Sequence, residues 1–374
     1  MNMVIDRKVY AEQIMQEFAL RTKLIGGGNP KRYLWSDAFA VCNFLGLYES
    51  RKDTRYLDLA KKLVDQVHFT LGQHRDDDNQ KGWISGLPDK KGMKHPTIGG
   101  LRIGKSLPER KPHELFDENL EWERDGQYFH YLTKWMHALN RMTEMTGEYH
   151  YNIWAIELAK TAFEKFTYIE PNSGQRLMYW KMSTNLSRPL VSSMGQHDAL
   201  DGWITYMKLQ KVAKTNPAYD PKLDLSEEIS ELKKMVTVTQ LATADALGIG
   251  GLLSDLWFLT QTSLNEKAML EKLLVASVQS MQAFIQHDKS LSYPANYRLA
   301  FRELGLSLGL EATQKMDKKL SEPFAHYLPV AEEIVAFWSD PENQKSNTWQ
   351  EHENINAVTL ATVLAPEGYL GGKR

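Results

Sequence analysis

The stretch Ala38–Leu47, AFAVCNFLGL, would be apolar on nearly every side if it formed a helix. Two later stretches share this character, namely Ile249–Leu259, IGGLLSDLWFL, and Ala357–Leu364, AVTLATVL. A helix without a polar face has to be covered on all sides, because apolar surface is unfavourable in water. The three stretches therefore predict inner helices that are enclosed by other helices.

Apolar residues at three- and four-residue spacing extend this pattern to about twelve helices. No stretch alternates apolar and polar residues for long enough to predict a β-strand, so the expected fold class is all-α. The predicted segments are Val9–Leu24, Ser36–Ser50, Tyr56–Leu71, Gly126–Thr146, Tyr149–Thr167, Gln196–Val212, Leu225–Leu241, Gly250–Thr262, Glu266–His287, Tyr297–Leu308, His326–Trp338 and Asn354–Leu364.

The connections between these segments differ in length in a regular way. Those that lead into even-numbered helices are often long, such as Gln73–Asp125 and Tyr168–Gly195, whereas those that follow them are often short, such as Lys52–Arg55. Up-and-down hairpins of this kind place the N-terminal ends of all even-numbered helices on one face, with the long loops that usually carry function. We expect one domain, 1–374, an (α/α)6 toroid of six helical hairpins with a functional insertion at about 73–125.

Composition narrows the classes of function. Hydrophobic residues make up 42% and charged residues 25%, as in an ordinary globular protein, and the net charge of −2 argues against nucleic-acid binding. The single cysteine, Cys42, allows no internal disulfide. Neither a signal peptide nor a membrane span is expected, because charges such as Asp6, Arg7 and Lys8 interrupt the N-terminal region and no apolar run reaches about 18 residues. The simplest expectation is a cytoplasmic enzyme.

Six hairpins, apolar inner helices and polar or aromatic residues at the inner-helix N-termini resemble the six-hairpin glycosidase superfamily. The stretch Arg124-Asp125-Gly126-Gln127-Tyr128, with the long helix that follows, is similar to the acid-bearing inner helix of unsaturated glucuronyl hydrolases. This resemblance implies an enzyme that acts on carbohydrates. The same fold also houses sugar epimerases and isomerases, so the type of reaction stays open.

Carboxylates gather at three of the predicted inner-helix starts. Asp125 precedes one helix, Asp198 opens another, and Glu353 precedes the last. A glycosidic bond needs one carboxyl group to protonate the leaving oxygen and a second to activate water or attack the sugar. We therefore predict Asp125 and Asp198 as acid and base of a glycoside hydrolase, with Glu353 as a competing carboxylate. Capping of the helix N-terminus is the structural alternative for Asp125 and Asp198.

Aromatic and polar side chains at the same helix starts suit a sugar, whose apolar C–H faces lie on rings and whose hydroxyls bond to carboxylates, amides and guanidinium groups. Packing of the aromatic rings in the interior is the alternative. The predicted substrate-binding residues are Trp35, Asp37, Trp83, Arg102, Glu121, Arg124, Tyr128, His130, Asp201, Trp203, Tyr297 and Trp349.

Histidines support a second hypothesis. His130, His197 and His352 all lie near inner-helix starts, and imidazoles shuttle protons near neutral pH. The alternative function is therefore a sugar epimerase or isomerase that uses His197 and His352 as its proton-transfer pair. A third hypothesis is a glycan-binding protein without catalytic activity.

Two motifs in the insertion suggest other ligands. Asp76, Asp77 and Asp78 provide oxygens for a hard cation, but their spacing lacks the pattern of an EF-hand, so no metal or cofactor is predicted. Arg102 and Lys105 suggest contact with an anionic group, which would fit an acidic or phosphorylated sugar. Surface ion pairs are the alternative for the arginines of this region. The oligomeric state does not follow from the sequence.

Overall fold

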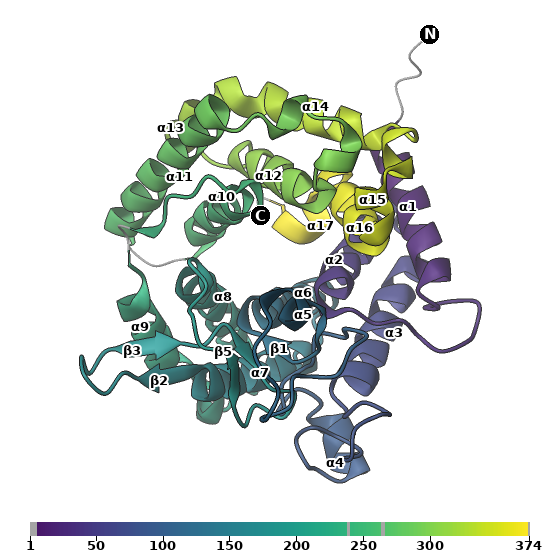
Figure 1. Ribbon diagram of the computed structural model, residues 1–374, viewed down its shortest axis with the longest axis vertical. Helices are drawn as coiled ribbons and strands as arrows, with labels where there is room; N and C mark the ends of the chain where they lie inside the picture. Colours follow the sequence, from purple (N-terminus) through teal and green to yellow (C-terminus); the bar gives the residue numbers. More distant parts are fainter. Residues whose placement is uncertain (1–5, 238–239, 263–265, 373–374) are drawn as a thin grey trace. The chain divides into compact units, whose positions relative to one another are not determined.

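The computed structural model describes residues 6–237, 240–262 and 266–372 (Figure 1). The chain divides into two compact units. Unit 1 comprises Met1–Arg21, Cys42–Tyr56 and Thr237–Arg374, and unit 2 comprises Thr22–Val41 and Leu57–Val236. The expectation of a single domain stays a prediction.

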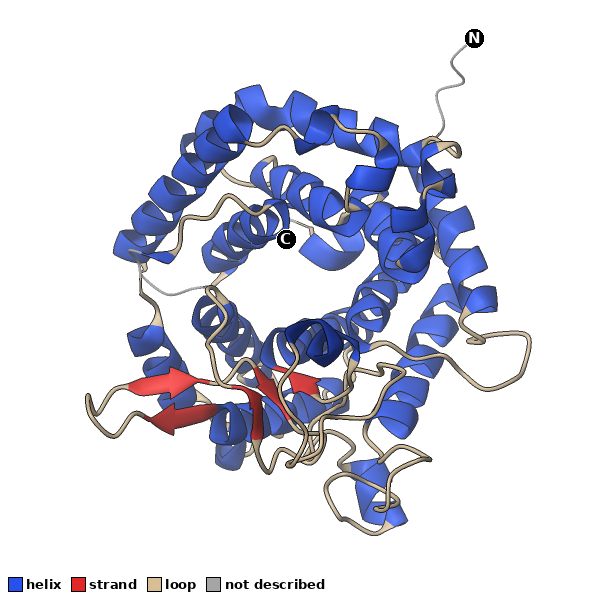
Figure 2. Ribbon diagram, viewed as in Figure 1, coloured by secondary structure: helices blue, strands red, loops and turns tan. Residues whose placement is uncertain are grey.

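All twelve predicted helices are present, and helices dominate both units (Figure 2). Their bounds are α1 Arg7–Arg21, α2 Leu34–Arg51, α3 Thr54–Leu71, α6 Phe129–Thr146, α7 His150–Phe166, α8 Asp198–Ala213, α9 Ser226–Met235, α10 Ala246–Gln261, α11 Lys267–His287, α12 Ala300–Thr313, α14 Leu328–Ser339 and α16 Glu353–Leu364. The predicted segment Leu225–Leu241 is too long, because α9 ends at Met235; residues 238–239 lie outside the described part.

Short elements connect these helices. The short α-helices are α4 Asp89–Lys94, α5 Glu118–Glu123, α13 Lys318–Ser321, α15 Asn347–Glu351 and α17 Glu367–Leu370. The 3-10 helices are η1 Pro221–Leu223, η3 Ser290–Ser292, η4 Ala295–Tyr297, η5 Glu322–Tyr327 and η6 Asn343–Lys345. No helix among the described residues is long and apolar enough to cross a membrane.

In unit 1, glycines allow α10 and α12 to pack at very short range. A Cβ atom on Gly250 would lie 2.0 Å from the carbonyl oxygen of Gly305, and one on Gly309 would lie 2.7 Å from Cα of Gly250. Backbones can approach this closely only where side chains are missing. The apolar character of the α10 sequence is thus explained by burial against α12.

In the same unit, a buried amide joins the second half of α2 to the middle and C-terminal half of α16. Asn43 donates to the carbonyl of Val358 at 3.1 Å and accepts from the hydroxyl of Thr362 at 2.9 Å. Next to it, the thiol of Cys42 is buried, and a Cβ atom on Gly368 would lie 2.2 Å from the Cys42 carbonyl oxygen. The two hydrogen bonds thus provide partners for the amide of Asn43, the polar side chain in the middle of AFAVCNFLGL.

Unit 2 also contains short β-strands, which the search for alternating stretches did not indicate (Figure 2). β1, Gln127–Tyr128, pairs with β4, Lys181–Met182, which pairs with β5, Pro189–Val191; β2, Thr167–Ile169, pairs with β3, Arg176–Met178, all antiparallel. Strands of two or three residues are too short to give an alternating pattern. Because Gln127 and Tyr128 join this sheet, α6 begins at Phe129 and not at the predicted Gly126.

The predicted long insertion is folded back on the start of α6 in unit 2. The side-chain amide of Gln127 accepts from the backbone N–H of Leu101 at 2.8 Å and donates to the carbonyls of Gly99 and Thr184 at 3.1 and 2.6 Å. One side chain therefore connects the insertion with the loop between α7 and α8.

We predict that Gly250→Ala lowers the free energy of unfolding by about 1–3 kcal/mol, because the new methyl group must push α10 away from α12. Urea titration followed by tryptophan fluorescence measures this loss. Gly251→Ala is the matched control, since a Cβ atom there meets nothing within 4 Å. Equal stability of the two variants would contradict the close packing of the helices.

Candidate functional site

Asp198 has the most unusual environment of the predicted acids. It is the first residue of α8, and the N-cap is His197, so Asp198 does not cap the helix. Its carboxyl group is buried, and Oδ2 has no hydrogen-bond partner among the described residues. Burial and then the charge of Asp201 raise the pKa of Asp198 to about 7, against the opposing effect of Lys134. Such a group exchanges protons at neutral pH.

Gly195 provides the space for this carboxyl group. A Cβ atom on Gly195 would lie 2.4 Å from Oδ2 of Asp198 and 2.6 Å from its Oδ1. Any side chain at this position would therefore displace the carboxyl group. The missing side chain at Gly195 thus leaves room for the carboxyl group of Asp198 beside the loop before α8.

His130, in the first turn of α6, faces Asp198. Its Nδ1 lies 3.9 Å from Oδ1 of Asp198, and 25% of its side chain is exposed. Nδ1 is buried and has no hydrogen-bond partner among the described residues. Burial and then the charge of Lys134 lower the pKa of His130 to about 3, so the ring is neutral at physiological pH. A neutral imidazole and a carboxyl group of raised pKa thus share one site.

Asp201 is held in place by α6. Its Oδ1 lies 2.8 Å from Nζ of Lys134, and its Oδ2 accepts from the hydroxyl of Thr133 at 2.5 Å. Both carboxylate oxygens are therefore engaged by the protein. Asp201 acts on the site through its negative charge, which raises the pKa of its neighbour Asp198.

Aromatic rings surround His130 within unit 2. Trp35 lies 6.1 Å and Tyr128 5.2 Å from the imidazole ring, and Trp180 is stacked on it at 6.0 Å with an interplanar angle of 15°. Tyr131 lies 5.1 Å from Trp35, and its hydroxyl is 2.6 Å from that of Tyr33. Hereafter this group of rings is called the aromatic cluster; its members are Tyr33, Trp35, Tyr128, Tyr131 and Trp180.

The sequence predicted Trp35, Tyr128, His130 and Asp201 for the site, and the structure brings all four to Asp198 or its neighbours. Trp180 was missed. It lies between β3 and β4 in the long connection before α8, and only the length of that connection pointed to a functional role. Tyr33 was missed because it precedes α2 by one residue, just ahead of the predicted helix start.

Asp125 has a different environment from the one predicted for an acid or base. It is 0% exposed and does not cap α6, whose N-cap is Tyr128. Its Oδ2 lies 2.9 Å from Nη1 of Arg102, and its Oδ1 accepts from the backbone N–H of Gly104 at 2.9 Å. Arg75 adds a third contact at 3.4 Å. Both oxygens are committed, which favours a structural role for Asp125 and Arg102.

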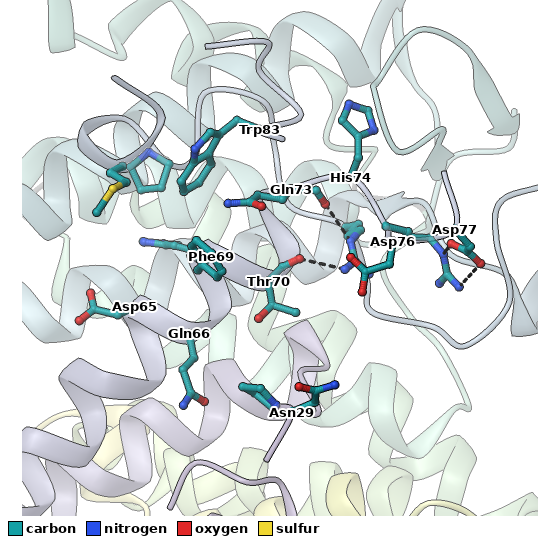
Figure 3. A pocket seen from close by; sticks show the side chains of 16 residues that line it. Asn29, Asp65, Gln66, Phe69, Thr70, Gln73, His74, Asp76, Asp77 and Trp83 are labelled. Atoms are coloured by element: carbon teal, nitrogen blue, oxygen red, sulfur yellow. Dashed lines mark hydrogen bonds and ion pairs between the residues drawn. The ribbon is translucent and has the colours of Figure 1, made fainter. Parts of the chain in front are cut away.

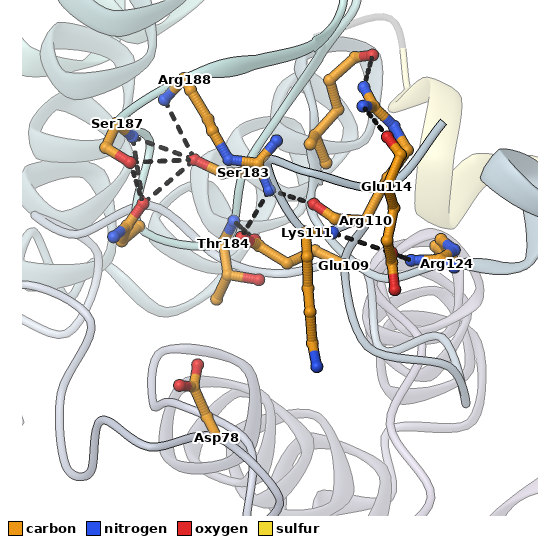
Figure 4. Close-up of polar contacts among 12 residues, drawn as sticks. Asp78, Glu109, Arg110, Lys111, Glu114, Arg124, Ser183, Thr184, Ser187 and Arg188 are labelled. Atoms are coloured by element: carbon orange, nitrogen blue, oxygen red, sulfur yellow. Dashed lines mark hydrogen bonds and ion pairs between the residues drawn. The ribbon is translucent and has the colours of Figure 1, made fainter. Parts of the chain in front are cut away.

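Glu121 and Arg124 also have protein partners. Glu121 is buried between Arg110, at 2.9 Å, and Lys181, at 3.0 Å, and burial lowers the pKa of Lys181. Arg124 pairs with Glu114 at 2.5 Å. These contacts join the insertion to the β4–β5 hairpin, where Glu109 also accepts from the guanidinium group of Arg188 (Figure 4). Neither predicted substrate-binding role is supported by these contacts.

Three further predicted binding residues of unit 2 are buried. Asp37 lies 3.3 Å from Arg32, and burial raises the pKa of Asp37 to about 6. Trp203 is a core residue with no exposed face for a sugar, and Trp83 packs against Gly92. Trp203 therefore packs in the protein interior, which was the alternative to sugar binding.

His197, predicted as one of the proton-transfer pair, is the N-cap of α8 in unit 2, and the other remaining predicted residues belong to unit 1. Glu353 pairs with Arg21 at 3.1 Å, His352 lies edge-on to Phe301 at 5.7 Å, and Trp349 is buried against Trp338. Tyr297 is exposed. A site shared by Asp125, Asp198 and Glu353 stays a prediction.

Two carboxylates of the acidic run in the insertion contact neighbouring side chains. Asp77 pairs with Arg75 at 2.7 Å, and Asp78 lies 3.3 Å from Nδ1 of His74. No group of three His, Cys, Asp or Glu side chains suited to a metal ion occurs in the described ranges.

Solved structures share this fold. The chain resembles a GH76 alpha-mannanase from Bacteroides thetaiotaomicron over 97% of its length and 96% of that chain, with a TM-score of 0.58 and 11% identity. A GH76A alpha-1,6-mannanase from Salegentibacter sp. HEL1_6 (97% and 99% covered, TM-score 0.56, 12% identity) and a D-mannose isomerase (97% and 99% covered, TM-score 0.55, 13% identity) are also similar. The chain therefore has the all-α, (α/α)6 fold of the six-hairpin glycosidases, as predicted. No protein-family model and no curated protein sequence matches it.

We predict that Asp198→Asn changes the pH dependence of stability. The folded-state pKa of Asp198, about 7, lies above the ordinary value of 3.8. Between pH 3.8 and about 7, the folded protein thus keeps a proton on Asp198 that the unfolded chain releases. The stabilisation of the folded state by this proton is complete below pH 3.8 and is lost as the pH rises towards 7. In urea titrations over this pH range, the free energy of unfolding of the original protein should fall by roughly 2–4 kcal/mol through Asp198, and that of the variant should not. Parallel profiles of the two proteins would contradict the raised pKa.

We predict that Asp125→Asn is mainly a stability variant and loses about 3 kcal/mol of unfolding free energy, because Arg102 is left without its charged partner. Asp58→Asn, at an exposed position of α3, serves as the control and should unfold like the original protein. An Asp125→Asn protein of normal stability but without activity would restore Asp125 as a catalytic acid.

Proposed function

We propose that this protein is a carbohydrate-active enzyme and that it transfers protons on a sugar, as an epimerase or isomerase does. The observation that carries the proposal is the contact between Asp198, whose pKa is about 7, and the neutral ring of His130. The aromatic cluster beside them offers flat apolar faces for the C–H side of a sugar ring. The similar structures include a D-mannose isomerase, which supports the same assignment.

The chemistry follows from the protonation states. At neutral pH a large share of Asp198 is ionised, and the carboxylate can remove the proton next to the carbonyl group of an open-chain sugar. The electron pair of the broken C–H bond forms an enediolate, whose oxygen is stabilised by hydrogen bonding to a neighbouring donor. The neutral imidazole of His130 supplies that donor when its proton resides on Nε2, because Nδ1 is buried and faces Asp198. Return of the proton from Asp198 to the adjacent carbon, together with passage of the remaining hydroxyl proton from one enediolate oxygen to the other, gives the isomer. For the epimer, the enediolate turns its other face to Asp198 before the proton returns to the same carbon.

Glycoside hydrolysis is the second candidate. It is favoured by the likeness in fold to two alpha-mannanases and by a carboxyl group that is partly protonated at neutral pH. Hydrolysis needs a second carboxyl group, however, and in unit 2 the carboxylates of Glu121, Asp125 and Asp201 are engaged by lysine or arginine. Proton transfer on one sugar requires no such partner, so we place it first.

We predict that Asp198→Asn lowers kcat/KM by about 10²- to 10⁴-fold on the sugar that is turned over, because the proton-transferring group is removed. Purified protein in deuterated water is screened by NMR against pooled mono- and oligosaccharides, with Asp58→Asn as the control variant. Deuterium at the carbon next to the carbonyl group, absent with Asp198→Asn, supports the epimerase or isomerase.

Other outcomes of the same screen decide against this reaction. New reducing-end signals that depend on Asp198 would establish the hydrolase instead. Line broadening of a sugar without any turnover, unchanged in Asp198→Asn, would show a glycan-binding protein. Turnover that survives Asp198→Asn at full rate would remove Asp198 from the site.

A further inference from the structure

A groove of about 940 Å³ lies in unit 2 along α3, at residues outside the aromatic cluster (Figure 3). One face of α3 provides its floor, since Asp65, Gln66, Phe69 and Thr70 follow one another at spacings that share a helical face. Segments before and after α3 complete the wall with Asn29 and with Trp83. The groove is thus built by local sequence around one helix.

The apolar part of this groove is unusually exposed. Phe69 is 63% exposed and Met93 is 65% exposed, although both residues line the same groove. Figure 3 shows the ring of Phe69 between Trp83 and Gln66. Ligand-binding clefts combine apolar and aromatic surface with a few polar groups, and this groove has that combination.

The two arginines of the groove have their donors engaged by the protein and so do not favour an anionic ligand. Arg75 uses its guanidinium group on Asp77, Asp125 and the carbonyls of Lys105 and Ser106. Arg102 is likewise bound to Asp125 and to the carbonyls of Gln73 and Thr70. The anion-binding role expected for Arg102 is therefore not supported, because its donors point into the protein.

Hydrogen-bonding groups remain available to a polar, uncharged ligand. No ion pair within 4.0 Å is found for Asp65 or Asp76 in the described part of the chain, and both residues line the groove. Carboxylates and amides bond to pairs of hydroxyl groups, while rings cover C–H faces. We propose that this groove binds a neutral oligosaccharide, at a second site separate from Asp198.

This inference concerns binding and does not depend on the reaction proposed above. The test uses the full-length protein labelled with ¹³C at the methionine methyl groups, and Met93→Leu assigns the Met93 signal. α-1,6-mannotetraose and cellotetraose are titrated as neutral probes, tri-galacturonate as an acidic probe and choline as a cationic probe. The neutral sugars should shift the Met93 signal in a saturable manner.

Phe69→Ala should weaken this binding about tenfold, because one stacking face is lost. Since Phe69 is exposed, the variant should fold normally; Val275→Ala, at an exposed position of α11, is the matched control and should bind like the original protein. Asp198→Asn should keep the Met93 shift even if all turnover is lost, which separates the two proposals.

Three results would overturn the inference. The first is a Met93 signal that does not move with either neutral sugar. The second is an equal or stronger shift with tri-galacturonate or choline, which would assign the groove to a charged ligand. The third is an identical affinity for Phe69→Ala and the original protein.

Discussion

The buried carboxylate of Asp125 is the interaction on which the candidate site depends. It accepts hydrogen bonds from Arg102, from Arg75 and from the backbone of Gly104, and all three belong to the long insertion. Asp125 itself lies just before β1 and α6, so these bonds fasten the insertion to the segment that carries Tyr128 and His130. A charge buried at such a place is stable only when it is fully paired, and the pairing therefore fixes the position of the loop.

Asp125 and Asp198, the two acids near helix starts, show how the surroundings of a carboxyl group determine what it can do. Asp125 has partners for both oxygens, whereas Asp198 has an unpaired Oδ2 and shares its neighbourhood with another acid. The same side chain is a structural anchor in one place and a proton-exchanging group in the other. Within unit 2, the neutral imidazole and the aromatic cluster then make the second place suitable for a sugar.

The helices could be predicted from the sequence because many of them repeat their apolar residues at helical spacing over several turns, as α3 and α6 do. The strands could not, since β1 and β4 have two residues each and owe their form to pairing between distant segments. Asp198 and His130 could be named as candidates because helix starts are marked in the sequence, and their roles in a site stay predictions. The engagement of Asp125 by Arg102 could not, because nothing local distinguishes a paired carboxylate from an unpaired one.

The buried position of Cys42 has a practical consequence. The only cysteine of the chain lies in a helix core with its carbonyl group against Gly368, so reagents that modify thiols have no access to it in the folded protein. Cysteines introduced at exposed positions can therefore carry spectroscopic labels without removal of the native residue. A pair of labels, one in each unit, would measure the distance between the units directly in solution.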